Sequence, residues 1–341
     1  EILFEQDIMA AGKGYFSIGD WEVSPNNQLI AWAEDSVGRR QYQLFVKDLA
    51  TGKTFSDVVE NIEANIVWAD DNQTLFYIEK DPVTLLSKRV KTHVLDDDSK
   101  NDKLVYEEAD DSFYMGISRT RSEQYICISV HSTVSTEQRC ALASDPTEFK
   151  VLAKRVRDFE YAADHLNGRW VIRTNWKAPN YKLMTLNESA NIGKRDTWQE
   201  FIAHKDDVFI EGFELFNDFI AIEERSNALL RIRTLSNSDK VEYVASDEPA
   251  YTMGLNVNAS PDTSWLRYSY TSLTTPGSVY EINTQTGERK LLKRDPVLGD
   301  FNADDYVTER QWAIARDGTK IPVSIVYKKG FKKDGSAALL Q

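Results

Sequence analysis

The chain has 341 residues, of which 41% are apolar and 11% aromatic, a composition that supports a sizeable core and excludes an intrinsically disordered protein. Its 54 acidic and 41 basic side chains give a formal net charge of −13, which argues against binding to nucleic acids or docking on anionic membranes. No stretch approaches the roughly 20 apolar residues of a membrane-spanning helix, and the first residues lack the pattern of a signal peptide.

Short strand patterns then dominate the chain. They are rich in β-branched and aromatic residues and are bounded by turn formers. The clearest are residues 28–33, 74–79, 124–130, 168–174, 218–223 and 265–270. A second strand follows each after a loop, as at 42–49 and 229–235, and a third, shorter strand often follows, as at 241–244 and 290–293. No long stretch has a helical period, so we expect an all-β fold.

Turn-forming clusters precede these strands at a regular spacing. From Ser24 to Ser260 the spacing is about 47 residues, which is typical of four-stranded propeller blades. A β-sandwich would use shorter and less regular spacing, so we favour a seven-bladed β-propeller type with about six complete blades and a partial one. Residues 1–5 are interpreted as the outer strand of the partial blade. Each unit also carries an aromatic residue expected to pack between neighbouring sheets: Trp21, Trp68, Phe113, Phe159 and Phe213.

The cysteines and histidines suggest no metal or disulfide chemistry. Cys127 and Cys140 are the two cysteines, too few for a disulfide framework in a chain of this length. A pair across a hairpin is the alternative, but we interpret them as buried free thiols of a cytoplasmic protein. The four histidines are scattered without ligand spacing, so no metal and no cofactor is expected.

The blade pattern changes near the C-terminus. Residues 308–315 and 320–327 flank an Asp-Gly turn at Asp317 and Gly318, which is a strong hairpin signal. On spacing alone this hairpin could be a seventh blade. The chain starts without Met and ends on Leu-Leu-Gln, and both ends look cut from a longer protein.

At this hairpin the sequence resembles a known family. Residues 316–323 (RDGTKIPV) are similar to the first strands of the α/β-hydrolase domain in the prolyl oligopeptidase family of serine peptidases, most of all its oligopeptidase B (protease II) branch. Residues 38–42 (GRRQY), 175–181 (NWKAPNY) and 270–276 (YTSLTTP) also look like family positions. The resemblance covers nearly the whole chain. It implies a propeller over residues 1–303 and the opening hairpin of the hydrolase domain over 304–341.

The resemblance also implies an activity. Oligopeptidase B-like enzymes cleave short peptides after Lys or Arg with a Ser-Asp-His triad in the hydrolase domain. That domain packs on one face of the propeller, which limits access to small substrates. This sequence has no Gly-x-Ser-x-Gly nucleophile elbow. We therefore expect no catalytic residue in this chain and an inactive fragment of an active serine endopeptidase. The alternative is a propeller that serves as an interaction scaffold without peptidase activity.

Four residues are candidates for contacts with substrate or the hydrolase domain. Asn175 and Trp176 belong to a loop expected to border the reaction cavity, although Trp176 departs from the basic residue expected of prolyl-specific relatives. Arg39 and Arg40 either pair with acids across the domain interface or cover an edge strand. The expected partners are short basic peptides and the chain's own hydrolase domain, with no nucleic acid and no membrane, since an acidic surface concentrates cations.

Overall fold

The computed structural model describes residues 2–189 and 192–338, and most of its regular structure is β-strand. Its described helices are α1 (Gln6–Ala10) and the 3₁₀ turns η1 (Ser99–Asn101), η2 (Arg195–Thr197) and η3 (Ala303–Asp305). Within the described residues, none is long and apolar enough to cross a membrane. The chain divides into two compact units: unit 1 comprises residues 1–174 and 184–199, and unit 2 comprises residues 175–183 and 200–341.

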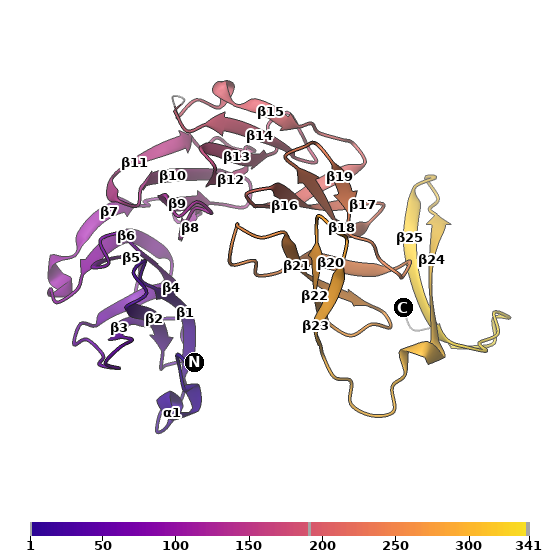
Figure 1. Cartoon of the computed structure of the whole chain (residues 1–341), viewed down its shortest axis with the longest axis horizontal. Coiled ribbons are helices and arrows are strands. Elements are labelled where there is room, and N and C mark those ends of the chain that lie inside the picture. Colours follow the sequence, from indigo (N-terminus) through magenta and orange to yellow (C-terminus); the bar gives the residue numbers. More distant parts are fainter. Residues whose placement is uncertain (1, 190–191, 339–341) are drawn as a thin grey trace. The chain divides into compact units, whose positions relative to one another are not determined.

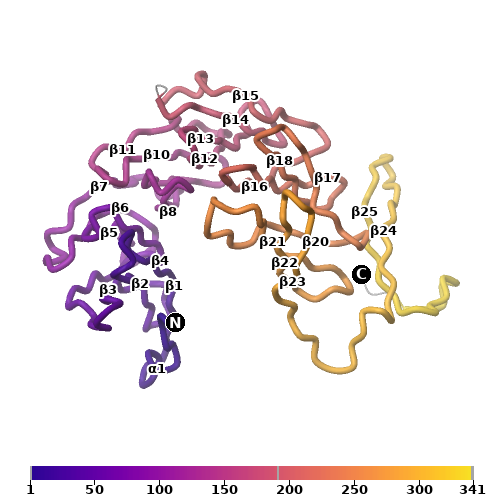
Figure 2. Tube along the Cα trace, viewed as in Figure 1, coloured from indigo at the N-terminus to yellow at the C-terminus, as the bar shows by residue number. Residues whose placement is uncertain are grey.

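The first sheet of unit 1 contains two blades whose strands follow chain order (Figures 1 and 2). Its strands are β1 (Ser17–Val23), β2 (Leu29–Asp35), β3 (Tyr42–Asp48), β4 (Val59–Trp68), β5 (Thr74–Lys80), β6 (Ser87–Val94) and β7 (Lys103–Glu107). The start of β4 pairs with β3 and the remainder pairs with β5. Blade 1 therefore consists of β1–β3 and the start of β4, and blade 2 consists of β4–β7.

Each later blade is a four-stranded sheet of consecutive strands (Figure 1). Blade 3 is β8 (Tyr114–Arg119), β9 (Tyr125–His131), β10 (Thr136–Leu142) and β11 (Asp145–Ala153); blade 4 is β12 (Tyr161–Leu166), β13 (Arg169–Thr174), β14 (Lys182–Asn187) and β15 (Gln199–Ile202). Blade 5 is β16 (Val208–Leu215), β17 (Phe219–Ser226), β18 (Leu229–Ser236) and β19 (Val241–Tyr243); blade 6 is β20 (Tyr251–Leu255), β21 (Trp265–Ser272), β22 (Ser278–Asn283) and β23 (Arg289–Arg294). The all-β propeller prediction is confirmed. The sequence patterns had located the second to fourth strands of the blades, whereas first strands such as β8 and β20, which are short and contain glycine, gave too weak a signal.

The turns that provided the sequence spacing join neighbouring blades. Four of them contribute a backbone N–H to an acceptor in the next blade, so much of the spacing repeats a physical connection as well as a strand pattern. The hydrogen bonds run from Asn26 to Asn72 Oδ1 (2.8 Å), from Asp70 to the Ala143 carbonyl (3.1 Å), from Ser122 to the His165 carbonyl (2.9 Å) and from Asn217 to the Pro261 carbonyl (3.0 Å).

The expected interblade aromatics do not all pack alike. Trp68 is 2% exposed and donates its indole N–H to the Glu22 carbonyl at 3.1 Å, and Phe159 is also buried. Trp21, however, is 50% exposed, so its predicted packing role is wrong. Its neighbour Asp20 accepts the Ile66 N–H of blade 2. Because adjacent strand residues point to opposite faces, Trp21 points away from blade 2.

The N-terminal segment does not form the predicted outer strand. Within the described residues 2–5 there is no strand, and α1 follows directly. The segment instead covers the face of blade 1 opposite blade 2. Phe4 packs edge-on against Trp32 at 5.5 Å between ring centroids, and Lys47 Nζ donates to the Leu3 carbonyl at 3.0 Å. The segment thus packs its side chains against the face of a sheet, whereas the sequence predicted a strand paired along a sheet edge.

Cys127 and Cys140 form a disulfide, so the prediction of free thiols is wrong. The two residues are direct partners across β9 and β10, with Cα atoms 4.1 Å apart. Both side chains are buried. The strand register, which the sequence spacing of 13 residues does not reveal, places the sulfur atoms together.

The predicted C-terminal hairpin is present as β24 (Tyr306–Ile314) and β25 (Lys320–Lys328), a separate two-stranded sheet. Gly318 has φ of +88°, and the Asp317 carboxylate accepts the Thr319 N–H at 2.9 Å, which together close the turn. Sequence spacing left open a seventh blade, but the described residues form only these two strands here.

Candidate functional site

One end of each blade is marked by the path of the chain. In a sheet of four consecutive antiparallel strands, the first strand begins, the second and third strands join, and the fourth strand ends at the same edge. We call this the exit end, because the chain leaves blade 6 from it after Arg294 and continues to β24. Arg39 and Arg40 lie in the β2–β3 loop, and Asn175 and Trp176 lie in the β13–β14 loop. Both predicted pairs are therefore at the exit ends of their own blades, the first in unit 1 and the second in unit 2.

The β2–β3 loop is organised by one buried carboxylate. Asp35 is 1% exposed and accepts backbone N–H groups from Val37 (2.9 Å), Gly38 (2.8 Å) and Arg40 (2.8 Å). Burial alone would raise the pKa of Asp35, but these donors outweigh it and lower the pKa. The loop is thus held by an ionised carboxylate rather than by apolar packing.

Arg39 and Arg40 present their side chains to solvent from this fixed loop. The Arg40 carbonyl accepts from Lys80 Nζ at 2.8 Å, and Lys80 also pairs with Glu63 at 3.0 Å. Within the described residues neither guanidinium has an ion-pair partner. A fixed backbone with two exposed guanidinium groups can bind carboxylates of a substrate or of another domain.

The β13–β14 loop is a compact turn. Ala178 N–H donates to the Asn175 carbonyl (3.0 Å), and Asn180 Nδ2 donates to the carbonyls of Lys205 (3.1 Å) and Asp206 (2.8 Å). Trp176 is half-buried there. The loop is therefore tied down at both ends and fixes the position of its indole ring.

The ammonium groups of two lysines lie over the Trp176 ring. Lys177 Nζ is 5.4 Å and Lys182 Nζ is 5.6 Å from a ring centroid, within the range of cation–π attraction. Lys182 also pairs with Glu200 at 3.3 Å. The ring is thus already shared with intramolecular cations, and a basic substrate side chain would have to displace one of them.

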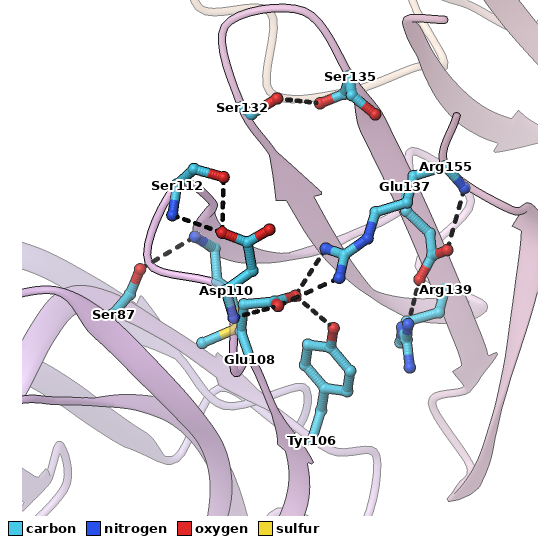
Figure 3. A network of polar contacts seen from close by, with 11 residues as sticks. Ser87, Tyr106, Glu108, Asp110, Ser112, Ser132, Ser135, Glu137, Arg139 and Arg155 are labelled. Atoms are coloured by element: carbon cyan, nitrogen blue, oxygen red, sulfur yellow. Dashed lines mark hydrogen bonds and ion pairs between the residues drawn. The ribbon is translucent and has the colours of Figure 1, made fainter. Parts of the chain in front are cut away.

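Sequence reasoning missed a polar network between blades 2 and 3 at their exit ends (Figure 3). The guanidinium of Arg155 binds both oxygens of Glu108 at 2.7 and 3.2 Å, and the Tyr106 hydroxyl donates to the same carboxylate at 2.7 Å. Burial opposes ionisation of Glu108, but the hydrogen bonds from Arg155 and Tyr106 lower its pKa to about 2. Burial and the bond to Glu108 raise the pKa of Tyr106 to about 12. Glu108 therefore keeps its negative charge, and Tyr106 its proton, throughout the neutral pH range.

A cavity of about 400 Å³ adjoins this network. Its lining includes Ser112, Ser135 and Arg155. The Ser112 hydroxyl donates to Asp110 at 2.7 Å (Figure 3). The Ser135 hydroxyl donates to the Val156 carbonyl at 3.1 Å. With their protons engaged, both hydroxyls can still accept hydrogen bonds, as a peptide N–H requires. No motif in the sequence marked this cavity.

One grouping has the composition of a catalytic triad. His165 Nδ1 is hydrogen-bonded to the Ser122 hydroxyl (2.8 Å), and its Nε2 is hydrogen-bonded to the Glu188 carboxylate (3.0 Å). His165 is fully buried, with Tyr125 and Trp170 rings about its own.

The surroundings of the Ser122 hydroxyl argue against a nucleophile. It also contacts the Thr120 hydroxyl at 3.0 Å and accepts the Gln124 N–H at 3.3 Å. These three partners fill the hydrogen-bonding capacity of a hydroxyl. The grouping therefore fastens blade 3 to blade 4, and the Ser122 hydroxyl has no free hydrogen-bonding position for a substrate. Among the described residues no set of three or more His, Cys, Asp and Glu side chains is placed to hold a metal ion.

Comparison with known proteins assigns the family. Residues 1–295 match the family model of the prolyl oligopeptidase N-terminal β-propeller domain. Dipeptidyl aminopeptidase BI of Pseudoxanthomonas mexicana is 54% identical over all of this chain and 47% of its own length, and Protease 2 of Moraxella lacunata is 27% identical over all of this chain and 49% of its own length. The chain thus spans about half the length of these curated relatives.

Solved structures agree. Oligopeptidase B from Leishmania major superposes with a TM-score of 0.89 at 26% identity, covering 98% of this chain and 48% of that one. Oligopeptidase B from Trypanosoma brucei gives a TM-score of 0.87 at 26% identity, with the same coverage. The repeated blades, the exit-end loops and these matches lead to one conclusion: the chain belongs to the prolyl oligopeptidase family, as its N-terminal β-propeller domain.

Proposed function

We propose that this chain is the propeller part of a serine peptidase that hydrolyses short peptides, and that residues 304–341 open the hydrolase domain that carries the Ser-Asp-His triad. The observation that carries the proposal is the 54% identity to a peptidase about twice as long. The separate β24–β25 sheet, which continues from the exit end of blade 6, supports the domain boundary near residue 303. The fragment alone is expected to be inactive.

The propeller is proposed to restrict the enzyme to small substrates. Within their own blades, the exposed Arg39 and Arg40 and the half-buried Trp176 lie in exit-end loops. Such a cover excludes folded proteins by size while it admits peptides. A net charge of −13 favours cationic peptides, which supports cleavage after Lys or Arg.

A second candidate activity comes from the relative with 54% identity, which is named a dipeptidyl aminopeptidase. We infer from this likeness a second candidate, in which the full-length protein releases dipeptides from the free N-termini of peptides. The two candidates differ in the need for a free α-amino group. An internal cut after Arg tolerates a blocked N-terminus, whereas dipeptide release does not.

One panel of substrates tests both. The full-length protein is assayed with a fluorogenic amide of a dipeptide whose second residue is Arg, the same compound with a blocked N-terminus, and labelled casein. Turnover of both amides supports an endopeptidase, and turnover of the free amide alone supports a dipeptidyl peptidase. Turnover of neither would leave the interaction scaffold as the better account. Added salt is expected to raise KM for Arg substrates, because it screens the acidic surface; an unchanged KM would refute electrostatic attraction.

The cytoplasmic location expected from the sequence stays a prediction. The Cys127–Cys140 disulfide argues against it, because such bonds persist mainly in oxidising compartments. Free thiols can be alkylated in freshly lysed native cells and the peptides that contain Cys127 and Cys140 analysed by mass spectrometry. Alkylated cysteines would support the cytoplasm, and an intact disulfide would support an oxidising compartment.

A further inference from the structure

A single carboxylate organises the β21–β22 turn of blade 6. Glu248, in the loop before β20, accepts four hydroxyl hydrogen bonds. Its Oε1 accepts from Ser272 (2.6 Å) and Thr274 (2.7 Å), and its Oε2 accepts from Tyr270 (2.8 Å) and Thr275 (2.7 Å). Burial opposes ionisation of Glu248, but the hydroxyl donors prevail and lower its pKa. Charge-assisted bonds of this kind are among the stronger ones in proteins, so the turn has one favoured shape.

The same turn holds the first residue of the connection to the hairpin. Asp295 N–H, directly after β23, donates to the Gly277 carbonyl at 2.8 Å. A Cβ atom on Gly277 would lie 2.7 Å from the Asp295 carboxylate, closer than such atoms approach. The turn and the departing chain therefore lie in close contact at Gly277, and a larger residue there would displace the Asp295 side chain.

The turn also touches the far end of that connection. The Thr274 hydroxyl, already bonded to Glu248, lies 3.3 Å from the Thr308 hydroxyl on β24. The exit end of blade 5 adds a further contact, because the Arg310 guanidinium donates to the Asn227 carbonyl in the β17–β18 turn. Residues 295–308 thus leave blade 6 and return to the same turn, whose conformation depends on Glu248.

We propose that Glu248 is a positioning residue that fixes where the hydrolase domain begins on the exit ends of blades 5 and 6. In this account the Glu248 carboxylate fixes the conformation of the β21–β22 turn, and this turn holds both ends of the connection formed by residues 295–308. The connection in turn determines the width of the opening through which substrates pass. The part about substrate size rests on the proposed function. The part about the connection does not.

Two measurements on the full-length protein separate these parts. The first is the rate of limited trypsin cleavage after Arg294, which reports the order of the connection. The second is the ratio of casein cleavage to peptide-amide cleavage, which reports the size limit. Glu248→Ala is expected to raise both by about tenfold, since it removes four charge-assisted bonds. Glu248→Gln, which keeps one acceptor oxygen, is expected to give values between those of Glu248→Ala and the wild type in both measurements.

Matched variants keep the test decisive. Glu242→Gln removes the same charge from an exposed position on β19 and is expected to change neither measurement. Thr308→Val keeps the Glu248 contacts and loses only the hydroxyl link to Thr274, so it is expected to raise trypsin cleavage without lowering Tm. This variant decides the matter if Glu248→Ala fails to fold.

Unchanged cleavage after Arg294 in both Glu248→Ala and Thr308→Val would overturn the positioning role. A wild-type protein that digests casein as readily as peptide amides would overturn the size limit of the proposed function. Faster trypsin cleavage in the variants would then still establish the role of Glu248 in the connection.

Discussion

Two buried histidines of unit 1 show how the partners of a buried ring decide whether burial determines its protonation. His93 on β6 is 1% exposed, and His165 on β12 is fully buried. Burial disfavours the charged form of both. Nevertheless the pKa of His93 is raised and the pKa of His165 is lowered.

The difference lies in the acids around each ring. His93 Nδ1 is 2.8 Å from Asp102 and its Nε2 is 3.6 Å from Asp57, and both carboxylates are buried. Burial lowers the pKa of His93, but the hydrogen bond to Asp102 and the charges of the two acids outweigh it. His165 faces a hydroxyl and Glu188, whose side chain is 42% exposed. Burial dominates there, and Glu188 and Asp164 offset only part of it.

The largest expected effect breaks the His93 site. Asp102→Ala leaves a buried imidazolium with the more distant Asp57 and removes the acceptor of the Tyr77 hydroxyl at 2.7 Å. Loss of one partner of a buried pair should lower the local unfolding free energy by about 3 kcal/mol. Hydrogen exchange of β6 amides at pH 6 measures this. Asp97→Ala, an exposed acid in the same loop, serves as the control, and equal protection in both variants would contradict the prediction.

The pH dependence should have opposite signs at the two sites. A raised pKa stabilises the fold below the ordinary value of about 6.5 and loses that contribution as pH rises through the folded pKa. A lowered pKa stabilises above about 6.5 and loses its contribution as pH falls toward the folded pKa. The destabilisation caused by His93→Gln should therefore shrink at high pH, and that caused by His165→Gln should shrink at low pH. Amide hydrogen-exchange protection of both variants, measured from pH 5 to 8, checks both expectations. If the destabilisation changed with pH in the same direction in both variants, the predicted difference between the two histidines would be refuted.

Ser122→Ala tests whether the Ser122–His165–Glu188 grouping is structural. It leaves His165 Nδ1 buried without its hydroxyl partner, and we expect a loss of about 1.5 kcal/mol in protection of the blade 3 turn. Peptidase activity of the full-length protein should be retained. The exposed Ser189→Ala is the matched control. Abolished activity in a folded Ser122→Ala protein would assign this serine a catalytic role.

Glu188→Gln should have the smallest effect. A half-exposed ion pair contributes less than about 1 kcal/mol, so stability should barely change. The pKa of His165 should nevertheless fall further, because an opposing negative charge is removed. Deuterium incorporation at the histidine C2 position, read by mass spectrometry, gives this pKa. A rise in the pKa of His165 in Glu188→Gln would show that the Glu188 carboxylate does not stabilise the protonated imidazole.

Much of the fold was predictable because its signals are local. Strands 74–79 and 265–270 and the turn at Gly318 depend on residues adjacent in sequence, and the recurring turns set the spacing of about 47 residues. Of the candidate site, the sequence placed Asn175 and Trp176 in a loop and left Arg39 and Arg40 between a domain interface and an edge strand, and the structure puts both pairs in exit-end loops of their own blades. Glu108, Arg155 and Glu248 gave no signal, because an acid or an arginine at the end of a strand resembles any solvated charge.

The sequence by itself determined the all-β composition, the repeat and the family resemblance, since each depends on residue type and order. Only the tertiary structure decided the Cys127–Cys140 disulfide, the exposure of Trp21 and the opposite behaviour of His93 and His165. Strand register and blade packing bring together groups that are far apart in the chain. The energies that distinguish a paired charge from a buried neutral ring arise only from those neighbours.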